Sequence, residues 1–473
     1  MKYGLRLNWS SASFPRPPLY APPRTRSLPS LLALARCVWR GDGDLLGLLP
    51  AAAYRTAIGP LGYSRRSTVI VNDPDLVLHV LKDPEQIFPK SDLMVGALEP
   101  LVGDSIFVSA GARWRRQREM IDPAFSHIRL NRAFTAMQAA VDAYEAHLDQ
   151  VAGEGSPISL DLAMSHLTAD IITRTVFSTP LQSQVAHDVF SDFAAFERHV
   201  AHVKLSRLIF DPAFAPVAQP PEVLAACTRI RWHLGEMIDT HLAAGASYDD
   251  IASAVIGARG PQAGTGTGFT REELIDQLGV FFLAGHETTA SVLTWVFFIL
   301  SIRPDIAAKV RAEVEAFAGA GPIDIDATKR LAYTRQVFRE TLRLYPPITF
   351  LPRVAMADTR LGGCRIRRGA LIMIAPWVIH RHQALWDKPD AFDPERFSPE
   401  REAKIRYGSY LPFGLGPRIC VGAAFAQTES ALILARLLRR FDFEPLAPEK
   451  VRPAARLTTR PADQVMVRVT RRG

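Results

Sequence analysis

Residues 413–422 read Phe-Gly-Leu-Gly-Pro-Arg-Ile-Cys-Val-Gly and lead into a long helical pattern over 420–441. A thiolate at the start of a helix is stabilised by the positive end of the helix dipole and by free backbone N–H groups. The glycines on both sides of the cysteine let the backbone approach a flat ligand closely. Phe413 can shield a sulfur from water, and Arg418 can meet an anion on the rim of that ligand. The stretch is therefore typical of a cysteine that binds a planar cofactor.

A haem held by a proximal Cys420 thiolate needs each of these features, because electron density pushed by the thiolate favours cleavage of an O–O bond. The alternative interpretation is a buried structural cysteine in a Gly-rich turn. Five spaced residues together favour the haem: Phe413, Gly416, Arg418, Cys420 and Gly422. We therefore predict haem b as the cofactor and Cys420 as the axial ligand of its iron.

The chain has 473 residues, of which 48% are hydrophobic and 22% are charged. This composition excludes bulk disorder, and the length allows a large dry interior. The 56 Lys and Arg residues exceed the 48 Asp and Glu residues, so the formal net charge is +8. Such an excess fits an acidic protein partner and does not require nucleic acid. The four cysteines form no Cys-x-x-Cys pair, which disfavours disulfides, zinc and iron–sulfur clusters and favours a reducing cytoplasm.

Long helical patterns with a few short hairpins between them predict a mainly α fold with small β-sheets. The apolar run 279–300 is long enough to span a bilayer, but an acidic residue at its middle would cost about 2.5–3.5 kcal/mol there. We therefore expect no integral membrane segment and interpret the run as the central helix of a soluble domain. Thr270 and Glu273 should form a capping box at its start. Residues 1–50 read as a partly loose, Pro- and Arg-rich extension, and 51–473 as one catalytic domain.

Four motifs, in order along the chain, resemble those of the cytochrome P450 superfamily. The stretch 413–422 matches its haem-binding pattern F-x-x-G-x-R-x-C-x-G at every specified position. Residues 284–289 (AGHETT) look like its oxygen-activation turn, 340–343 (ETLR) like its E-x-x-R motif, and 394–397 (PERF) like the segment that adds a second arginine. The resemblance covers about 60–460. It implies a single P450-like domain of the soluble bacterial type, with a long central helix over a buried haem.

By this resemblance, Glu340, Arg343 and Arg396 form a charge network that fixes the loop beneath the haem. Glu340 and Arg343 are three apart on one helix face and can pair, and Arg396 can close the network with bidentate contacts. A solvent-exposed helical ion pair is the alternative for the first two residues. The resemblance also implies that Trp114 and Arg118 contact the haem carboxylates, to which Arg353 and Arg418 add charge.

The turn 284–289 places polar groups among apolar side chains, where they must find partners or water. By the resemblance, Thr288 hydrogen-bonds dioxygen and Glu287 relays protons from solvent, so these two are the catalytic residues. A hydroxyl bonded to its own helix is the alternative, which we expect for Thr289 and not for Thr288. His286 is expected to be a spacer or a solvent contact.

The implied reaction hydroxylates or epoxidises an apolar small molecule, such as a fatty acid, a terpenoid or a steroid, with O₂ and two electrons. No Gly-x-Gly-x-x-Gly fingerprint follows a predicted strand, so the electrons must come from NAD(P)H through a separate ferredoxin- or flavodoxin-type partner. Basic residues could form an electropositive docking face for it: Arg396, Arg401, Lys404, Arg406 and Arg418.

The resemblance assigns an apolar substrate pocket to Phe107, Phe281, Phe282, Ile348 and Phe350. Arg113 or Lys90 could bind a carboxylate of the substrate. We expect a cytoplasmic monomer with no nucleic-acid partner. Three alternatives remain open: a peroxide-driven haem-thiolate peroxygenase, which would normally lack the acid–threonine pair; a non-catalytic haem-binding or sensor protein, which would need no proton relay; and a membrane transport protein.

Overall fold

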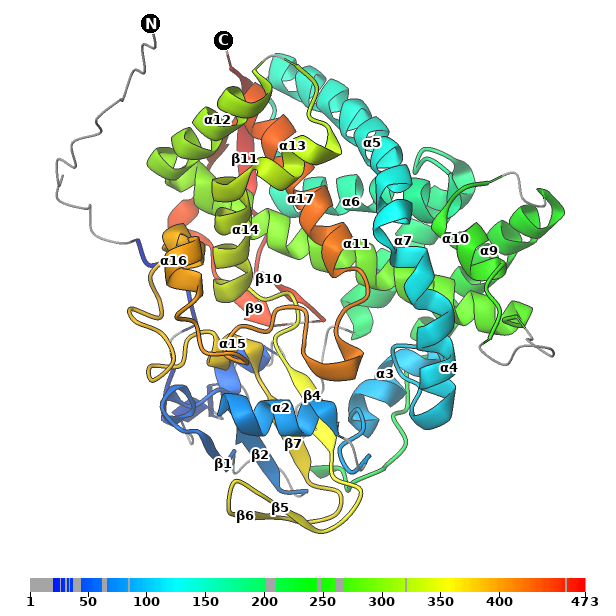
Figure 1. Ribbon diagram of the computed structural model, residues 1–473, viewed down its shortest axis with the longest axis vertical. Helices are drawn as coiled ribbons and strands as arrows, with labels where there is room; N and C mark the ends of the chain where they lie inside the picture. The colour runs from blue at the N-terminus through cyan, green and yellow to red at the C-terminus, as the bar shows by residue number, and fades with distance from the viewer. Residues whose placement is uncertain are drawn as a thin grey trace, which may run out of the picture.

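Helices form the upper and right-hand parts of the molecule and a small sheet forms its lower part (Figure 1). The mainly α fold with small β-sheets is therefore confirmed. The computed structural model describes these residues: 20–25, 27–29, 32–33, 35–36, 44–61, 66–83, 86–200, 210–244, 248–260, 268–319, 321–455 and 457–472.

The α-helices carry most of the chain. They are α2 Pro74–Lys82, α3 Asp92–Val102, α4 Gly111–Ile121, α5 His127–Glu154, α6 Leu160–Phe177, α7 Gln184–Val200, α9 Pro221–Ala244, α10 Ile251–Ile256, α11 Arg271–Ile302, α12 Pro304–Ala318, α13 Ile325–Arg330, α14 Ala332–Leu344, α15 Pro376–Ile379, α16 Pro399–Glu402 and α17 Ala423–Arg440. Short 3-10 helices are η1 Leu45–Leu48, η2 Ala51–Tyr54, η3 Asp122–Phe125, η5 Pro394–Phe397, η6 Gly416–Arg418 and η7 Pro448–Lys450.

The strands form small, separate sheets. They are β1 Ile58–Pro60, β2 Thr68–Val71, β3 Ile158–Ser159, β4 Leu351–Val354, β5 Thr359–Leu361, β6 Cys364–Ile366, β7 Leu371–Ile374, β8 Phe441–Pro445, β9 Pro453–Ala455, β10 Thr459–Pro461 and β11 Met466–Arg471. The largest sheet has the order β1-β2-β7-β4, in which β2 and β7 are parallel and the other neighbours antiparallel. A three-stranded sheet has the order β3-β11-β8, and β9–β10 and β5–β6 are two-stranded.

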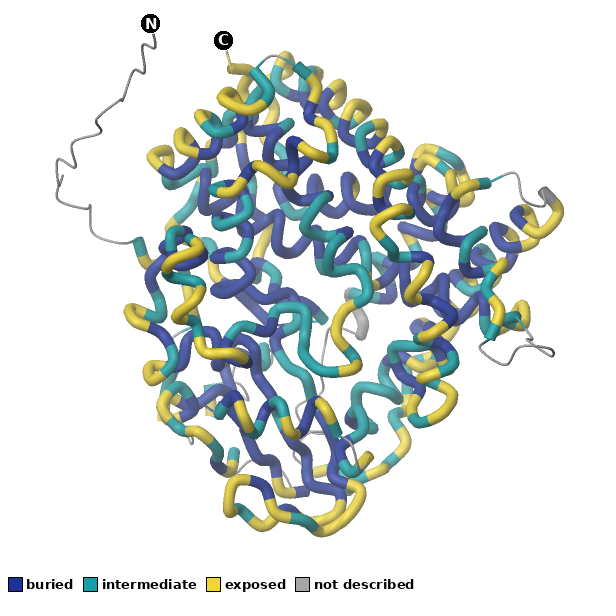
Figure 2. Tube along the Cα trace, viewed as in Figure 1, coloured by how far each residue is buried: buried dark blue, intermediate teal, exposed yellow. Residues whose placement is uncertain are grey.

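The central helix α11 is buried along almost its whole length (Figure 2). The predicted capping box at its start is confirmed: the Thr270 hydroxyl accepts the Glu273 N–H, and the Glu273 carboxylate accepts the Thr270 N–H. It packs against α6, α9, α3 and α14. Among the described helices it alone has the length and composition to cross a membrane, yet 83% of its apolar window is buried in the protein. Its apolar surface is therefore explained by the core around it.

The helix after the cysteine begins later than predicted. α17 begins at Ala423 after Gly422, so Cys420 lies in the turn before the helix and not inside it. The reason is local: η6 reverses the chain at Gly416–Arg418, and helical dihedrals begin only past Gly422.

The boundary predicted at residue 50 does not separate a loose segment from the domain in the described part of the chain. The Tyr20 carbonyl oxygen accepts the Phe392 N–H at 2.7 Å, and the Pro23 carbonyl oxygen accepts the Tyr345 hydroxyl at 2.5 Å. Side chains of η1 are buried in the core. The described residues between Tyr20 and Leu48 therefore contact the domain; residues 1–19 lie outside the described part.

Candidate active site

Cys420 is held in a tight turn at the wall of a cavity. Its N–H donates to the Phe413 carbonyl oxygen at 2.9 Å, and the Ile419 N–H donates to the Gly416 carbonyl oxygen at 3.1 Å. The accessible surface of Cys420 faces a cavity of about 300 Å³ inside the protein. Burial raises the pKa of the thiol, with the Gly422 N–H acting against it. A bound metal ion would supply the positive charge that a thiolate needs at this place.

The cavity lies between the cysteine turn and α11. The cysteine turn contributes Phe413, Gly414, Arg418, Cys420 and Gly422. Across from them stand residues of α11: Phe281, Ala284, Gly285, Thr288, Thr289 and Val292. Phe107, Ile348 and Phe350 supply further apolar walls. The cavity thus has a sulfur at one side, hydroxyls of α11 at the other and apolar walls between them.

Three cations meet at one edge of this cavity: Lys90, Arg353 and Arg418. Lys90 and Arg353 are paired by an isolated β-bridge, and Arg418 stacks over the Trp114 ring at 4.6 Å. The Lys90 ammonium lies 3.7 Å from the Phe107 ring centre and donates to the Phe107 carbonyl oxygen. Three positively charged side chains therefore lie close together at a buried edge of the cavity, where each disfavours the charge of the others.

The pKa values of these cations show that the negative charge near the cluster does not offset its burial: Asp83 raises the pKa of Arg353 and of Arg418, but both stay below their ordinary value. Burial, then the charge of Arg418, lowers the pKa of Arg353 to about 10. Burial also lowers that of Arg418 to about 10 and that of Lys90 well below its usual value. Arg418 Nη1 is buried without a hydrogen-bond partner among the described residues. A planar ligand with two carboxylates fits this edge, and the thiol fits its metal, so the residues present fit a haem.

Arg118 braces the cysteine turn from α4. Its Nη1 donates to the Ile419 carbonyl oxygen at 2.8 Å, and its Nε lies 2.6 Å from the Asp122 carboxylate. Trp114 and Arg118 both line the cavity, and their contact with the haem carboxylates stays a prediction. Gly416 does not line it; a Cβ there would lie 2.9 Å from the Leu81 carbonyl oxygen, so this glycine serves the contact between η6 and α2.

The three charged residues of the E-x-x-R network lie together in the interior. Arg343 donates to Glu340 through Nε at 2.7 Å and through Nη2 at 2.8 Å, and both side chains are fully buried. Arg396 Nε lies 3.3 Å from Glu340 Oε1, which also accepts the Asp393 N–H at 2.9 Å. Arg343 further donates to three carbonyl oxygens: those of His380, Pro389 and Ala391. The exposed ion pair that was the alternative is therefore excluded.

Sequence reasoning missed that His380 joins this network to the cysteine segment. Its Nδ1 lies 3.1 Å from the Arg343 carbonyl oxygen, and its Nε2 accepts the Leu411 N–H at 2.9 Å. A carbonyl oxygen only accepts and a backbone N–H only donates, so the ring is neutral with its proton on Nδ1. Burial, then the Arg343 charge, lowers its pKa to about 3, which keeps it neutral.

Of the two threonines in the 284–289 turn, Thr288 differs from expectation. The Thr288 hydroxyl donates to the Ala284 carbonyl oxygen at 2.6 Å, so it forms the bond to its own helix that we expected for Thr289. Both side chains line the cavity. A hydroxyl that donates to its helix still has lone pairs that can accept a hydrogen bond from the cavity. Because this bond depends on the rotamer and not on the residue type, the sequence could not assign it.

Glu287 is buried but is not among the residues that line the cavity. Its carboxylate accepts hydrogen bonds from Arg460 Nε at 2.7 Å and from the Thr458 hydroxyl at 2.6 Å. Burial raises its pKa, but the Arg460 charge and hydrogen bond outweigh burial, so the pKa lies below its ordinary value. Arg460, on β10, was missed because it lies outside every motif and 173 residues away from its partner.

Several expected surface and pocket residues lie elsewhere. Phe282 packs against Phe193 at 4.4 Å between ring centres and lies outside the cavity, because neighbouring residues of a helix point in different directions. Arg396 and Arg418 lie inside the protein and cannot belong to a docking face. Arg401 and Arg406 are paired with aspartates, and Arg113 pairs with Asp104 away from the cavity.

Comparisons with known proteins agree with this geometry. The family model described as Cytochrome P450 matches residues 58–467. Cyclooctatin synthase of Streptomyces melanosporofaciens is 34% identical, over 81% of this chain and 82% of that protein. Cyclooctat-9-en-7-ol 5-monooxygenase of the same organism is 33% identical, over 88% of each. The crystal structure of the cytochrome P450DA haem domain is 24% identical, with a TM-score of 0.80 over 96% of this chain and 98% of that chain, so it supports the fold.

Proposed function

Because the chain belongs to the cytochrome P450 family and is a haem-thiolate monooxygenase of apolar small molecules, we propose that its substrate is a terpenoid-like hydrocarbon skeleton and that a separate small redox protein supplies its electrons. The observation that carries the proposal is the thiol of Cys420 facing, across one cavity, the α11 turn with Thr288, with the buried cation cluster at its edge. The overall reaction balances as RH + O₂ + 2e⁻ + 2H⁺ → ROH + H₂O.

The haem, when bound, supplies the activation of dioxygen and the oxidation of the substrate. Cys420 Sγ would be the ligand of its iron, and the cluster of Lys90, Arg353 and Arg418 would pair with its carboxylates. The Thr288 hydroxyl, whose own proton is donated to Ala284, would accept a hydrogen bond at the α11 side of the cavity, and Glu287 would take up and pass on the next proton. The apolar walls exclude water, which protects the reactive centre from side reactions.

The cavity favours an uncharged guest over a fatty acid. Its charged side chains, among the described residues, are Lys90, Arg118, Arg353, Arg418 and Glu429. The four cations belong to the haem-carboxylate edge or to the cysteine turn, so none is left for a substrate carboxylate. Two relatives are named for cyclooctatin and cyclooctat-9-en-7-ol, the second of which is by its name a hydrocarbon skeleton with one double bond and one hydroxyl. Both observations support a terpenoid-like substrate.

An optical titration of the ferric protein with terpenes, terpene alcohols, steroids and fatty acids tests the substrate class. We expect terpenoids to displace the water ligand and shift the iron from low to high spin, and fatty acids to give no shift. Phe281→Leu should weaken terpenoid binding about tenfold, while Phe282→Leu, the adjacent buried residue outside the cavity, should not. A shift produced by fatty acids alone would refute the proposed substrate. Product formation with hydrogen peroxide alone, and none with an electron donor, would favour the peroxygenase.

The redox partner should dock beside α4. This helix turns Trp114 towards Arg418 and binds the Ile419 carbonyl oxygen through Arg118, which leaves Arg115 exposed on its outer side. Lys404, also exposed, makes no ion pair within the described part of the chain. Exposed cations near the haem edge would attract an acidic ferredoxin or flavodoxin. A ferredoxin or flavodoxin partner supports a cytoplasmic location. The spacing of the four cysteines, which disfavours disulfides, supports it as well.

Charge reversal tests this docking face. Arg115→Glu should slow electron transfer from a plant-type ferredoxin and weaken its dependence on salt, since long-range attraction is lost. Arg468→Glu changes the charge equally on β11, which lies at the upper left of Figure 1, away from α4 at the right. Equal effects of the two variants would contradict the docking face and leave the monooxygenase assignment intact.

A further inference from the structure

Glu287, the acid in the α11 turn, faces away from the cavity. We therefore expect its proton source on the side of α11 that lies away from the cavity. Glu287 is held there by Arg460 and Thr458, and Arg460 Nη1 also donates to the Ser165 hydroxyl at 3.0 Å. Arg460 belongs to β10, Thr458 directly precedes that strand, and Ser165 belongs to α6. The region behind Glu287 is therefore polar, although it lies deep inside a helical core.

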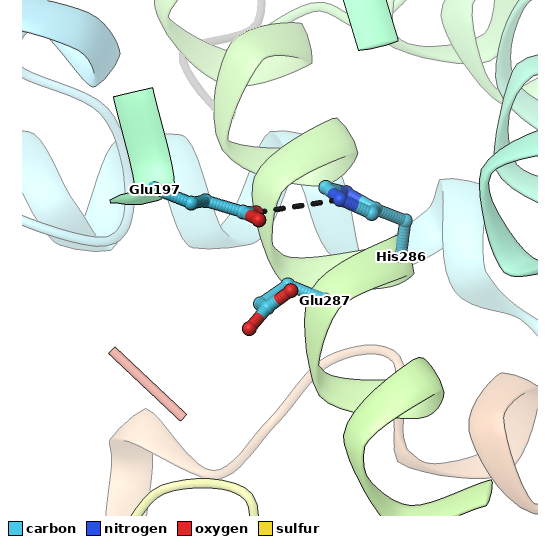
Figure 3. A group of neighbouring side chains, drawn as sticks. All are labelled: Glu197, His286 and Glu287. Atoms are coloured by element: carbon cyan, nitrogen blue, oxygen red, sulfur yellow. Dashed lines mark ion pairs between the residues drawn. The ribbon is translucent and has the colours of Figure 1, made fainter. Parts of the chain in front are cut away.

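A second carboxylate stands next to this region. Figure 3 shows Glu197, from α7, extending towards His286 of α11, with Glu287 beside them. Glu197 Oε1 lies 3.3 Å from His286 Nε2, and one oxygen or nitrogen atom of each of the three side chains lies within 4.8 Å of the others. The Glu197 side chain is 16% exposed, whereas those of His286 and Glu287 are 1% and 5% exposed. Glu197 is thus the most exposed side chain of the three, although its Oε1, which faces His286, is buried.

The contact between Glu197 and His286 offers an acceptor for one proton, because burial lowers the pKa of His286 and favours its neutral ring. His286 Nδ1 lies 3.0 Å from the Phe282 carbonyl oxygen, which can only accept, so Nδ1 carries a hydrogen. Nε2 faces the Glu197 oxygen, and this contact is attractive only if one further proton lies between them. The rings of Phe190, Phe193 and Phe282 surround the imidazole and hold it in this orientation.

The charges of the cluster favour such a proton. Arg460 interacts with Glu287 and Glu197 as well as with Asp161 of α6, so three carboxyl groups lie near one guanidinium. Carboxyl groups close together in a buried place favour proton binding by one of them. A proton shared by Glu197 and His286 brings the cluster closer to neutrality and keeps a proton within reach of Glu287.

We propose that Glu197 takes up protons from solvent and passes them to Glu287, with His286 holding the proton in position between them. The step balances as Glu197–CO₂H + Glu287–CO₂⁻ → Glu197–CO₂⁻ + Glu287–CO₂H, and one solvent proton restores Glu197. A separation of up to 4.8 Å can be crossed by one bridging water or by rotation of the Glu197 side chain. The inference rests on the proposed role of Glu287. It makes Glu197 and His286 positioning residues of the proton supply.

Glu197→Gln tests the proposal, because glutamine can still donate to His286 Nε2 but carries no exchangeable acid proton. The holoenzyme is driven by a plant-type ferredoxin and its NADPH-dependent reductase, with the terpenoid that gives the largest spin shift. We expect product formed per NADPH to fall about tenfold, with a larger solvent isotope effect in D₂O. Glu197→Asp should restore part of the loss. Asp192→Asn is the matched control: it is the same change on the same helix, at an aspartate paired with Arg229.

Hydrogen peroxide separates proton supply from damage to the site. The reaction RH + H₂O₂ → ROH + H₂O needs no outside proton, so Glu197→Gln should keep peroxide-driven turnover while it loses donor-driven turnover. Equal loss of both, or loss of haem or of the spin shift, would show a structural role and overturn the proposal. Unchanged coupling in Glu197→Gln, with a loss in Glu287→Gln, would overturn it while the function stands. Unchanged coupling in both would refute the role of Glu287 as well.

Discussion

Gly416 and Gly363 have similar left-handed backbones, with φ of 74° and 81°, but only Gly416 lies against another segment. A Cβ at Gly416 would lie 2.9 Å from the Leu81 carbonyl oxygen, whereas at Gly363 nothing lies within 4 Å. Left-handed backbone costs a non-glycine residue about 1–2 kcal/mol at either position. Gly416→Ala should therefore melt at a lower temperature than Gly363→Ala and purify with less haem, because backbone atoms of α2 must move. Equal melting temperatures and haem contents would contradict this reading of Gly416.

Lys90 has opposite effects on the haem-free and haem-bound protein. Without an anion, burial and the neighbouring Arg353 and Arg418 make its charge unfavourable, as its lowered pKa shows. With haem carboxylates present, the same charge would supply a hydrogen bond worth about 1.5–3 kcal/mol. Lys90→Met should leave the haem-free protein as stable or more stable, while haem transfers to apomyoglobin about tenfold faster.

Lys404→Met, which removes an exposed lysine, serves as the control for this prediction. It should change neither the melting temperature nor the rate of haem transfer. A Lys90→Met protein that loses stability without haem, or that keeps haem as long as the parent, would show that Lys90 is no part of an anion site.

Between elements, a buried ion pair joins the ends of α6, α9 and α10. His241 Nε2 lies 2.8 Å from Asp250 Oδ2, which also accepts the Ser178 hydroxyl at 2.8 Å, and Tyr248 stacks on the imidazole. Burial lowers the pKa of His241, but the hydrogen bond and charge of Asp250 outweigh it, so the pKa lies above 6.5. Burial raises the pKa of Asp250, yet His241, the Ser253 N–H and Ser178 hold it below 3.8.

These shifts predict a window of pH in which the pair stabilises the fold. The His241 contribution is complete below its unfolded pKa of 6.5 and is lost as the pH rises through the higher folded pKa. The Asp250 contribution is present above 3.8 and is lost as the pH falls through the lower folded pKa. Melting temperatures of the parent and His241→Gln should therefore differ most between about pH 4 and 6.5. A difference that grows at alkaline pH would contradict the assignment.

At the scale of the whole molecule, the Glu340 network ties α14 to the segments that surround the cysteine turn. Arg343→Ala would leave the buried Glu340 with Arg396 as its remaining cation among the described residues, and breaking a buried pair costs about 3–5 kcal/mol. We expect a protein with little haem and a strongly lowered melting temperature. Arg339→Ala, on the same helix, removes a partly exposed pair with Glu402 and should cost about 1 kcal/mol or less. Equal haem content in both variants would refute the network.

Sequence reasoning predicted much of the fold and of the haem side of the site. The capping box of α11, the mainly α architecture and the family followed from local patterns, and all three are confirmed. The position of Cys420 before a helix was predictable because glycines, turn and helix start are written within ten residues. The predicted start of α17 was three residues too early. The pattern of polar and apolar side chains does not distinguish the residues just before the helix from those inside it.

The directions of side chains were decided only by tertiary structure. Periodicity assigns Glu287 to a helix, but its partner Arg460 lies 173 residues away, and their pairing turns the carboxylate from the cavity. The resemblance placed Arg353 and Arg418 at the haem carboxylates, but the addition of Lys90 to them, like the meeting of Glu197 with His286, joins segments that share no motif. The sequence by itself determined which chemistry this protein carries, because the thiolate ligand and its glycines are local. Which protons and charges serve that chemistry was decided by packing, because electrostatic partners are set by distance in space.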